Sequence, residues 1–208
     1  MKQLADFHSR VMPHLPGCSV PLVNQFIVDA AIQFCEATGA IRQTMDAITL
    51  VPDMGVYDFD APSQQQVVRI TRAFLDGREI RLVPLNEAPT PQDRTGEPVF
   101  LHTISTDSYP EFVLTPAPDK AYSLVLEVAS RPTRTATALA DDLLTLWLEA
   151  ITAGAIGAGQ RIPAQPFTDP AGAGQRYAEF RSHISRARIN ASMGRVQGTQ
   201  RVRGRPLA

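Results

Sequence analysis

Cysteine, lysine and long apolar runs are scarce in this 208-residue chain, and each scarcity excludes something. The two cysteines, Cys18 and Cys35, belong to no CxxC or Cys/His cluster, which argues against a zinc site. A disulfide between them is possible but not needed, and we expect buried free thiols. No apolar run approaches the roughly 18 residues of a membrane span. Asp6, His8 and Arg10 interrupt the place where a signal peptide would be apolar, so we expect synthesis in the cytosol and no membrane partner.

Catalytic motifs are absent as well. The chain contains no GxGxxG, Walker, HExxH or GxSxG pattern. Four histidines lie far from one another and from any nucleophile, and surface or capping roles are expected for them: His8, His14, His102 and His183. Asp58 and Asp60 flank a strand residue, but two carboxylates without further oxygen ligands make a weak cation site. We therefore expect no catalytic residue, no metal and no cofactor, and a protein that is not an enzyme.

The C-terminal third has the apolar spacing of two helices. The first begins near Asp141, and its apolar face consists of Leu144, Trp147, Leu148, Ile151 and Ala155. The second begins where Asp169 precedes Pro170, a favourable N-cap arrangement. Its apolar seam consists of Ala173, Tyr177, Phe180, Ile184, Ala187 and Ala191. Because both faces need burial, we expect the two helices to fold back on each other as a hairpin.

Three glycines in the first of these helices allow two interpretations. Gly154, Gly157 and Gly159 can permit a close contact with another helix, or they can weaken the end of their own helix. The residue pattern leaves both interpretations open.

Strands are expected in the middle of the chain, after an N-terminal helix that Ser19 caps and Gly39 ends. From Ala47 the apolar period changes from helical to two, and about six short strands are expected up to residue 131. The dipeptide Asp76-Gly77 is a strong two-residue hairpin signal. Such strands predict an antiparallel sheet or a small barrel.

The order of these elements predicts an α+β fold. We expect one helical bundle built from both chain ends, with an inserted antiparallel β-module and an extended C-terminal arm. The expected divisions are 1–46 for the N-terminal helical part, 47–131 for the β-module, 132–193 for the C-terminal helical hairpin and 194–208 for the arm.

Charge is divided unevenly along the chain. Residues 1–172 carry 12 basic and 20 acidic side chains, a net charge of −8, whereas residues 173–208 carry eight arginines and one glutamate, a net charge of +7. The last 15 residues have no acidic side chain and no period, so we expect an arm that becomes ordered on an acidic partner. The residues expected to bind that partner are Arg195, Arg201, Val202, Arg203, Arg205, Pro206 and Leu207. A solvated tail is the simpler alternative.

Several short strings resemble one family of virion proteins. They are Leu4-Ala5-Asp6-Phe7, Pro16-Gly17-Cys18, Leu114-Thr115-Pro116, Gly154-Ala155-Ile156 and Phe167-x-Asp169-Pro170. With the Arg-rich tail, they resemble the head-to-tail adaptor, or connector, proteins of tailed bacteriophages over nearly the whole chain. The resemblance implies a ring of twelve subunits under the portal, with the C-terminal segment docked on the portal. It also implies a place at the head–tail interface of the virion after synthesis in the host bacterial cytoplasm.

The main hypothesis is therefore a structural virion protein. Its partners would be further copies of itself, the portal protein, tail tube or nozzle proteins, and the packaged double-stranded DNA passing through the channel. The alternative is a nucleic-acid-binding protein that uses the Arg-rich C-terminal end, although no aromatic residue interleaves with the tail arginines. A cell-wall hydrolase is a third option, and it lacks the carboxylate pair that such chemistry needs.

Overall fold

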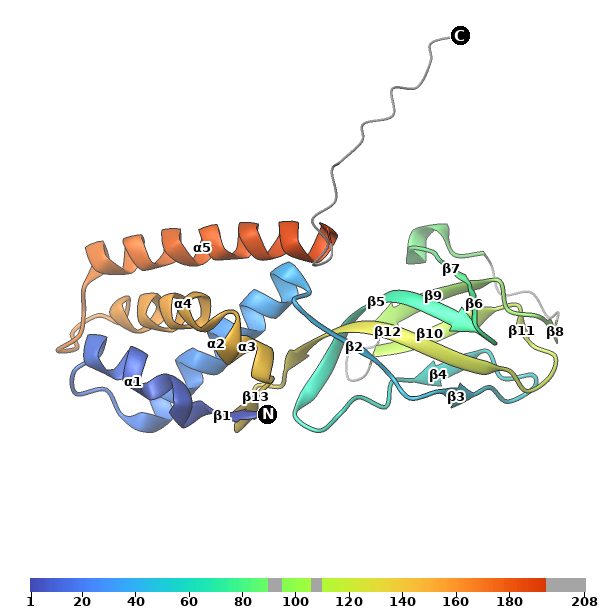
Figure 1. The fold of residues 1–208 in the computed structure, drawn as a ribbon, viewed down its shortest axis with the longest axis horizontal. Helices are drawn as coiled ribbons and strands as arrows, with labels where there is room; N and C mark the ends of the chain where they lie inside the picture. Colours follow the sequence, from blue (N-terminus) through green and yellow to red (C-terminus); the bar gives the residue numbers. More distant parts are fainter. Residues whose placement is uncertain (90–94, 106–109, 194–208) are drawn as a thin grey trace, which may run out of the picture.

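The computed structural model describes residues 1–89, 95–105 and 110–193. It shows an elongated molecule in which α-helices occupy one end and most strands the other (Figure 1). Within the described residues the α-helices are α1 (His8–Val11), α2 (Val20–Thr38), α3 (Asp141–Thr145), α4 (Leu148–Gln160) and α5 (Pro170–Met193). Short 3-10 helices lie at η1 (Leu4–Phe7), η2 (Met12–His14) and η3 (Leu85–Glu87).

The strands fall into four sheets. The five-stranded sheet joins β2 (Ile41–Thr44), β12 (Ser123–Pro132), β5 (Gln65–Leu75) and β6 (Arg78–Glu79), with β3 (Ile48–Thr49) also on β12. The four-stranded sheet has the order β4 (Val56–Asp58), β10 (Pro110–Thr115), β9 (Phe100–Ser105) and β7 (Arg81–Leu82). The two remaining sheets pair β1 (Lys2–Gln3) with β13 (Ala138–Leu139), and β11 (Ala117–Pro118) with β8 (Thr95–Gly96).

Helix α4 lies at the centre of the helical end, between α2 and α5. A Cβ atom at Gly154 would lie 2.9 Å from the Cβ of Ala30 on α2, and one at Gly157 would lie 2.9 Å from the ring of Tyr177 on α5. Any side chain at these two positions would push a neighbouring helix away. The glycines therefore permit a close helix contact, which resolves the two interpretations that the sequence left open.

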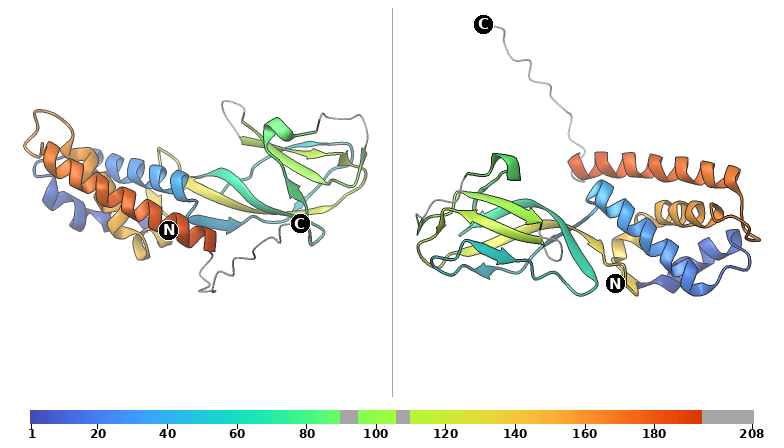
Figure 2. Two further views of the ribbon diagram at one scale, coloured as in Figure 1. Left: turned by 90° about the horizontal axis from the view of Figure 1, so that it is seen from above. Right: turned by 180° about the vertical axis from the view of Figure 1, so that it is seen from behind.

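The apolar seam predicted for α5 packs as expected. Ala173, Phe180 and Ala187 are buried, and Tyr177 and Ile184 are partly buried against the same core. The start of this helix is also confirmed, because Asp169 accepts a hydrogen bond on Oδ1 from the main-chain N–H of Gly172 at 2.9 Å. Views from above and from behind agree that α5 covers the outside of the helical end (Figure 2).

The helix expected from Asp141 onward is interrupted. Helix α3 ends at Thr145, and α4 begins at Leu148, because the backbone of Trp147 leaves the helical region (φ −127°, ψ 19°). The interruption coincides with an aromatic contact, since the rings of Trp147 and Phe34 pack with centroids 5.2 Å apart. The 3.6-residue spacing continues through this break and could not reveal it.

The strand end has its own core between the two larger sheets. Its buried residues come from both sheets and include Leu75, Leu101, Phe112, Leu124 and Leu126. They share no member with the helical core, which includes Phe7, Ile27 and Phe34. Two separate cores mean that each end can hold its own shape.

The hairpin predicted at Asp76-Gly77 is present. Leu75 pairs with Arg78 and Phe74 with Glu79, so the two residues between them form the turn. Both have positive φ, 46° at Asp76 and 81° at Gly77, as the two-residue hairpin turn requires.

The expected fold class, an α+β helical bundle from both chain ends with an inserted antiparallel β-module, is wrong. Strands are not a small insertion in a bundle, because they form four sheets and enclose a core of their own. Two strand pairs, β7–β9 and β11–β8, are parallel, and β1 pairs with β13. The chain is a mixed α and β protein rich in strands. Two-residue strands have no period to detect, which explains why the sequence pattern underestimated the β-structure.

Candidate interaction surfaces

The predicted partner-binding residues of the arm lie outside the described residues. They are Arg195, Arg201, Val202, Arg203, Arg205, Pro206 and Leu207, all within 194–208. The described part of the Arg-rich end is α5, with a net charge of +3 from four arginines and Glu179.

Two of the four α5 arginines have partners within the molecule. Arg176 pairs with Glu179 at 3.0 Å, and Arg188 donates a hydrogen bond from Nε to the carbonyl oxygen of Ala37 at 2.7 Å. Arg181 and Arg186 are exposed and have no partner among the described residues. The outer face of α5 is therefore cationic.

Arginines gather where the helical end meets the strand end. The last carbonyls of α2 accept from Arg188 of α5 and, at 3.4 Å, from Arg69 of β5. Arg131 of β12 pairs with Glu36 on the same helix and donates to Gln66 at 2.8 Å. The C-terminal end of a helix carries unpaired carbonyls and a partial negative charge, so cations stabilise it. This junction is polar, in contrast to the apolar core on either side.

A turn at the far end of the strand part holds apolar side chains in solvent. We call residues 51–56, which run from the loop after β3 to the first residue of β4, the apolar turn. Val51, Met54 and Val56 are 53%, 46% and 44% exposed. The hydroxyl of Tyr57 accepts a hydrogen bond from the main-chain N–H of Val51 at 3.0 Å. The same hydroxyl donates a hydrogen bond to the carbonyl oxygen of Val51 at 3.1 Å.

Further main-chain bonds fix the apolar turn to the sheets. The N–H of Asp53 donates to the carbonyl of Pro118 at 2.8 Å, and the N–H of Leu114 donates to the carbonyl of Gly55 at 2.8 Å. Asp53 has a φ of 62°, which is uncommon for a residue with a side chain and is tolerated best by Asp and Asn. The turn is thus held in one conformation while its apolar side chains remain exposed.

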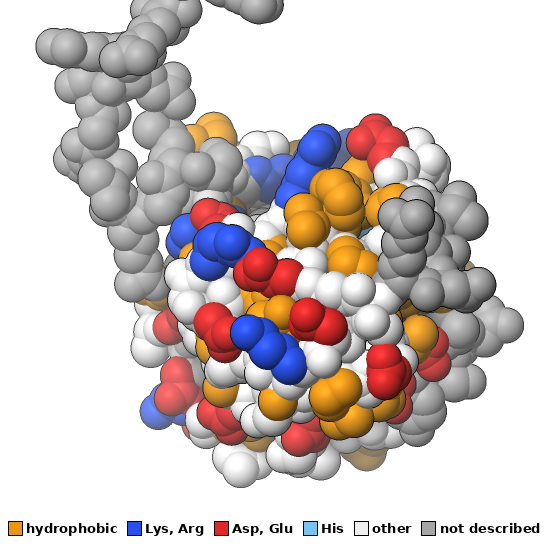
Figure 3. All heavy atoms as spheres, turned by 90° about the vertical axis from the view of Figure 1, so that its right-hand side faces the viewer, with side chains coloured by type: hydrophobic (Ala, Val, Ile, Leu, Met, Phe, Trp, Pro, Cys, Tyr) orange, Lys and Arg blue, Asp and Glu red, His pale blue; other side chains and the backbone are white. Residues whose placement is uncertain are grey.

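The strand end is acidic. Residues 47–131 carry 12 acidic and 7 basic side chains, a net charge of −5. Asp58 stands opposite Glu111 in the β4–β10 pairing, and like charges placed opposite each other across strands are unfavourable unless something else compensates them. Seen end-on, this part of the surface shows hydrophobic side chains among acidic and basic ones (Figure 3).

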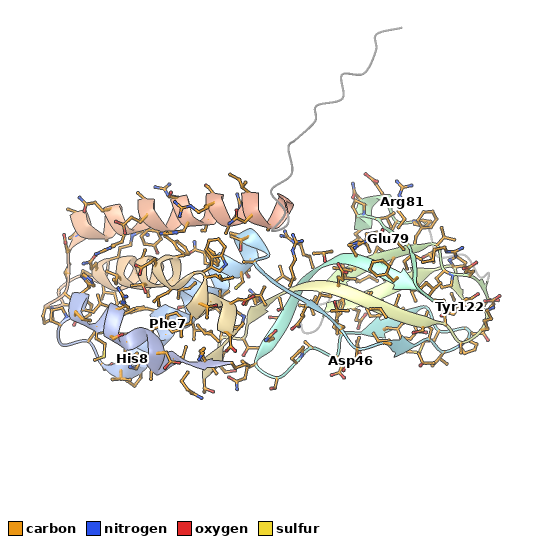
Figure 4. All side chains as sticks on the ribbon, viewed as in Figure 1. Phe7, His8, Asp46, Glu79, Arg81 and Tyr122 are labelled. Atoms are coloured by element: carbon orange, nitrogen blue, oxygen red, sulfur yellow. The ribbon has the colours of Figure 1, made fainter. Side chains whose placement is uncertain are left out.

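Burial and neighbouring side chains shift the pKa values of several titratable groups. Burial lowers the pKa of His102, whose Nδ1 has no partner among the described residues. Burial and the neighbouring Glu36 raise the pKa of the Cys35 thiol to about 12. A hydrogen bond to Asp119, 2.7 Å long, and burial raise the pKa of Tyr122 to about 12 (Figure 4). Both cysteines are free and buried, as expected.

Of the four histidines, His8 and His102 lie at opposite ends of the molecule. His8 bonds to the side chain of Asn24 at 2.6 Å, and His102 lies in β9 at the other end of the molecule. In residues 1–89, 95–105 and 110–193 there is no group of three or more side chains suited to hold a metal ion. No helix in this part of the chain is long and apolar enough to cross a membrane.

The described part of the chain thus has two cores, a polar junction between them, a cationic outer face on α5 and an exposed apolar turn. The family model described as "SU10 adaptor protein" matches residues 2–205. The chain belongs to this family of phage head–tail adaptors, which are structural components of the virion. A search of curated proteins finds no match to the chain.

Proposed function

We propose that this protein is the adaptor between the head and the tail of a tailed phage. Twelve copies form a ring that docks under the portal through the C-terminal arm. The ring continues the channel for the packaged double-stranded DNA and provides the platform for the tail tube or nozzle. The observation that carries this proposal is the family match over nearly the entire chain.

The parts of the chain are proposed to divide these tasks. Residues 1–46 and 132–193 hold the lateral contacts of the ring, residues 47–131 reach toward the tail, and residues 194–208 bind the portal. Identical copies close into a ring when the contacts between them are heterologous and the rotation closes. The +4 charge of residues 194–208 suits an acidic groove on the portal.

Mass measurement with and without the portal ring of the same phage tests the proposal. The protein alone is expected to be monomeric in dilute solution. On the portal it is expected to add the mass of twelve copies, and particle images should show a ring below the portal. A stable ring of the protein without the portal would contradict the assembly order, and failure to bind the portal would overturn the function.

A nucleic-acid-binding role is the second candidate. The observation in its favour is that Arg181 and Arg186 on α5 are exposed and have no partner in the part of the chain that the structure describes. Contacts with phosphates would give a duplex affinity that falls steeply with salt concentration. Tight, salt-dependent binding to duplex DNA, with no binding to the portal ring, would favour this role over the adaptor.

A further inference from the structure

We propose that the apolar turn, residues 51–56, is a preformed docking element for a protein partner with an apolar pocket and a basic rim. Within the proposed adaptor function, on which this inference rests, that partner is the tail tube or nozzle protein. The structure points to an apolar contact with a net acidic surround.

The exposure of the turn is the first argument. Three apolar side chains within six residues, Val51, Met54 and Val56, are each close to half exposed or more. Scattered exposed apolar residues are normal on a protein surface, but a contiguous group marks a contact site. Pro52 lies in the same turn and is exposed as well, so the whole projecting edge is apolar apart from Asp53.

The rigidity of the turn is the second argument. Tyr57 anchors Val51 through its hydroxyl, and its ring stacks on Phe112 in the strand core with centroids 5.5 Å apart and an angle of 15°. The positive φ of Asp53 is held by the bond from its N–H to Pro118. Strained positions persist where the surroundings enforce them, and they cluster at sites that bind partners. A contact that is already ordered loses little conformational entropy on binding.

Charge identifies the partner. Asp53 lies within the turn, and Asp58 shares the outer face of β4 with Val56. Asp119 directly follows Pro118, whose carbonyl accepts the hydrogen bond from Asp53. The exposed Lys120 follows Asp119, so the surround has three acidic side chains and one basic one and is net acidic. A net acidic surround disfavours nucleic acid phosphates and favours a basic protein surface. The arm, residues 194–208, is basic and suits an acidic partner. The apolar turn and the arm are therefore proposed to engage two different partners, and the apolar turn is assigned to the one that is not the portal.

The test uses the full-length protein assembled on its portal ring, with the purified tail tube or nozzle protein of the same phage as the probe. In the triple variant Val51→Thr/Met54→Ser/Val56→Thr, the two Val→Thr changes keep the size and the strand preference of valine, Met54→Ser shortens its side chain, and all three changes remove apolar character. We expect its affinity for the probe to fall tenfold or more, with docking on the portal unchanged. The matched control is Leu85→Ser/Val99→Thr, at two other exposed apolar residues of the strand part (60% and 48% exposed), and it should bind as wild type.

Two single variants examine the parts of the argument. Tyr57→Phe keeps the stacked ring but releases Val51, so affinity should fall through faster dissociation. Asp53→Asn tolerates the same positive φ and removes one charge, so the salt dependence of binding should become weaker.

The outcomes separate this inference from the proposed function. Wild-type protein that does not dock on the portal overturns the adaptor role and the assignment of the tail-side partner with it. Wild-type protein that docks and binds the probe, together with a triple variant that binds the probe equally well, overturns the docking element alone. An equal loss of affinity for the probe in the triple variant and in the Leu85/Val99 control also overturns it. So does a triple variant that binds the probe normally and has lost only its ability to associate with other copies of the protein.

Discussion

The Nε atom of Arg188 on α5 donates a hydrogen bond to the main-chain carbonyl oxygen of Ala37, 2.7 Å away in the last turn of α2. That carbonyl is one of the helix-end acceptors without an intrahelical partner. The bond joins the end of α5, from which the arm continues, to the point where the chain passes from helix into strand at Ile41. The C-terminal end of α5 is thus linked to the junction of the two ends of the molecule.

Replacing Arg188 with Met should remove this bond while retaining the aliphatic stem. A hydrogen bond from a charged group at a partly solvated site contributes about 1 kcal/mol, which for a chain of this length lowers Tm by roughly 2–4 °C. Differential scanning calorimetry measures the change. Arg186→Met is the matched control, because Arg186 is exposed and has no partner within the described part of the chain, and its Tm should equal that of wild type.

The hairpin turn offers a test of the strand part. Gly77 has a φ of 81°, and a Cβ atom added there would meet no neighbouring heavy atom of the described residues within 4 Å. Only backbone strain therefore opposes a side chain at this position. Gly77→Val should destabilise the strand part by roughly 1–2 kcal/mol or more. The single tryptophan, Trp147, packs on Phe34 in the helical core, so its fluorescence reports that core. Denaturant unfolding should show an earlier strand transition by circular dichroism and an unchanged tryptophan transition.

A second glycine provides the control for this substitution. Gly174 is exposed in α5 and has a helical rather than a positive φ. A Cβ atom added there would also meet no neighbouring heavy atom of the described residues within 4 Å. Gly174→Ala should stabilise the helical part by up to about 1 kcal/mol, whereas Gly77→Ala should destabilise the strand part. If both alanine variants shift stability in the same direction, the positive φ at Gly77 is not what the turn requires.

His102 should make the strand part sensitive to acid. Burial lowers its pKa in the folded state, whereas the unfolded chain has the ordinary value of about 6.5. Above that pH both states are neutral, and below it the unfolded state binds the additional proton, so stability falls as pH falls from about 6.5 toward the folded-state pKa. Unfolding curves between pH 7.5 and about 5 should show this loss in wild type and a smaller loss in His102→Gln. His14→Gln, at an exposed histidine, should behave as wild type.

The extent to which sequence predicted this structure depends on whether the signal was local. The α5 seam, the Asp169 N-cap and the Asp76-Gly77 turn are set by neighbouring residues, and all three are present. The pairing of Lys2 with Leu139 joins residues that are far apart in the sequence, so it leaves no local pattern. The apolar turn was not predicted for a similar reason. Its conformation depends on hydrogen bonds from Val51 to Tyr57 and from Asp53 to Pro118, and the second of these joins residues far apart in the sequence.

The two thiols should be unreactive while the helical core is folded. Cys35 is fully buried with a pKa raised to about 12, and burial also raises the pKa of Cys18. Because the thiolate is the reactive form, a thiol-specific reagent at pH 8 should label neither residue in native protein and both in denaturant. Rapid labelling of Cys35 in native protein would show that α2 does not pack as described.

The C-terminal arm carries the central claim, that this chain joins heads to tails by anchoring on the portal. Both cores are built from residues between Leu4 and Ala187, so deleting residues 196–208 should leave Tm and the circular dichroism spectrum unchanged. The deletion removes Arg201, Arg203 and Arg205, whose forked contacts with carboxylates are each expected to contribute about 1–3 kcal/mol when shielded from water. A variant in which these three arginines are changed to glutamine and the rest of the arm is kept separates the effect of the arm's charge on joining from the effect of its length.

The most direct measurement is the yield of joined particles when purified heads, purified tails and either wild-type or truncated protein are mixed. The account predicts that wild-type protein joins heads to tails, whereas protein lacking residues 196–208 folds normally and leaves DNA-filled heads that leak and do not join. Truncated protein that joins heads to tails at wild-type yield would contradict it.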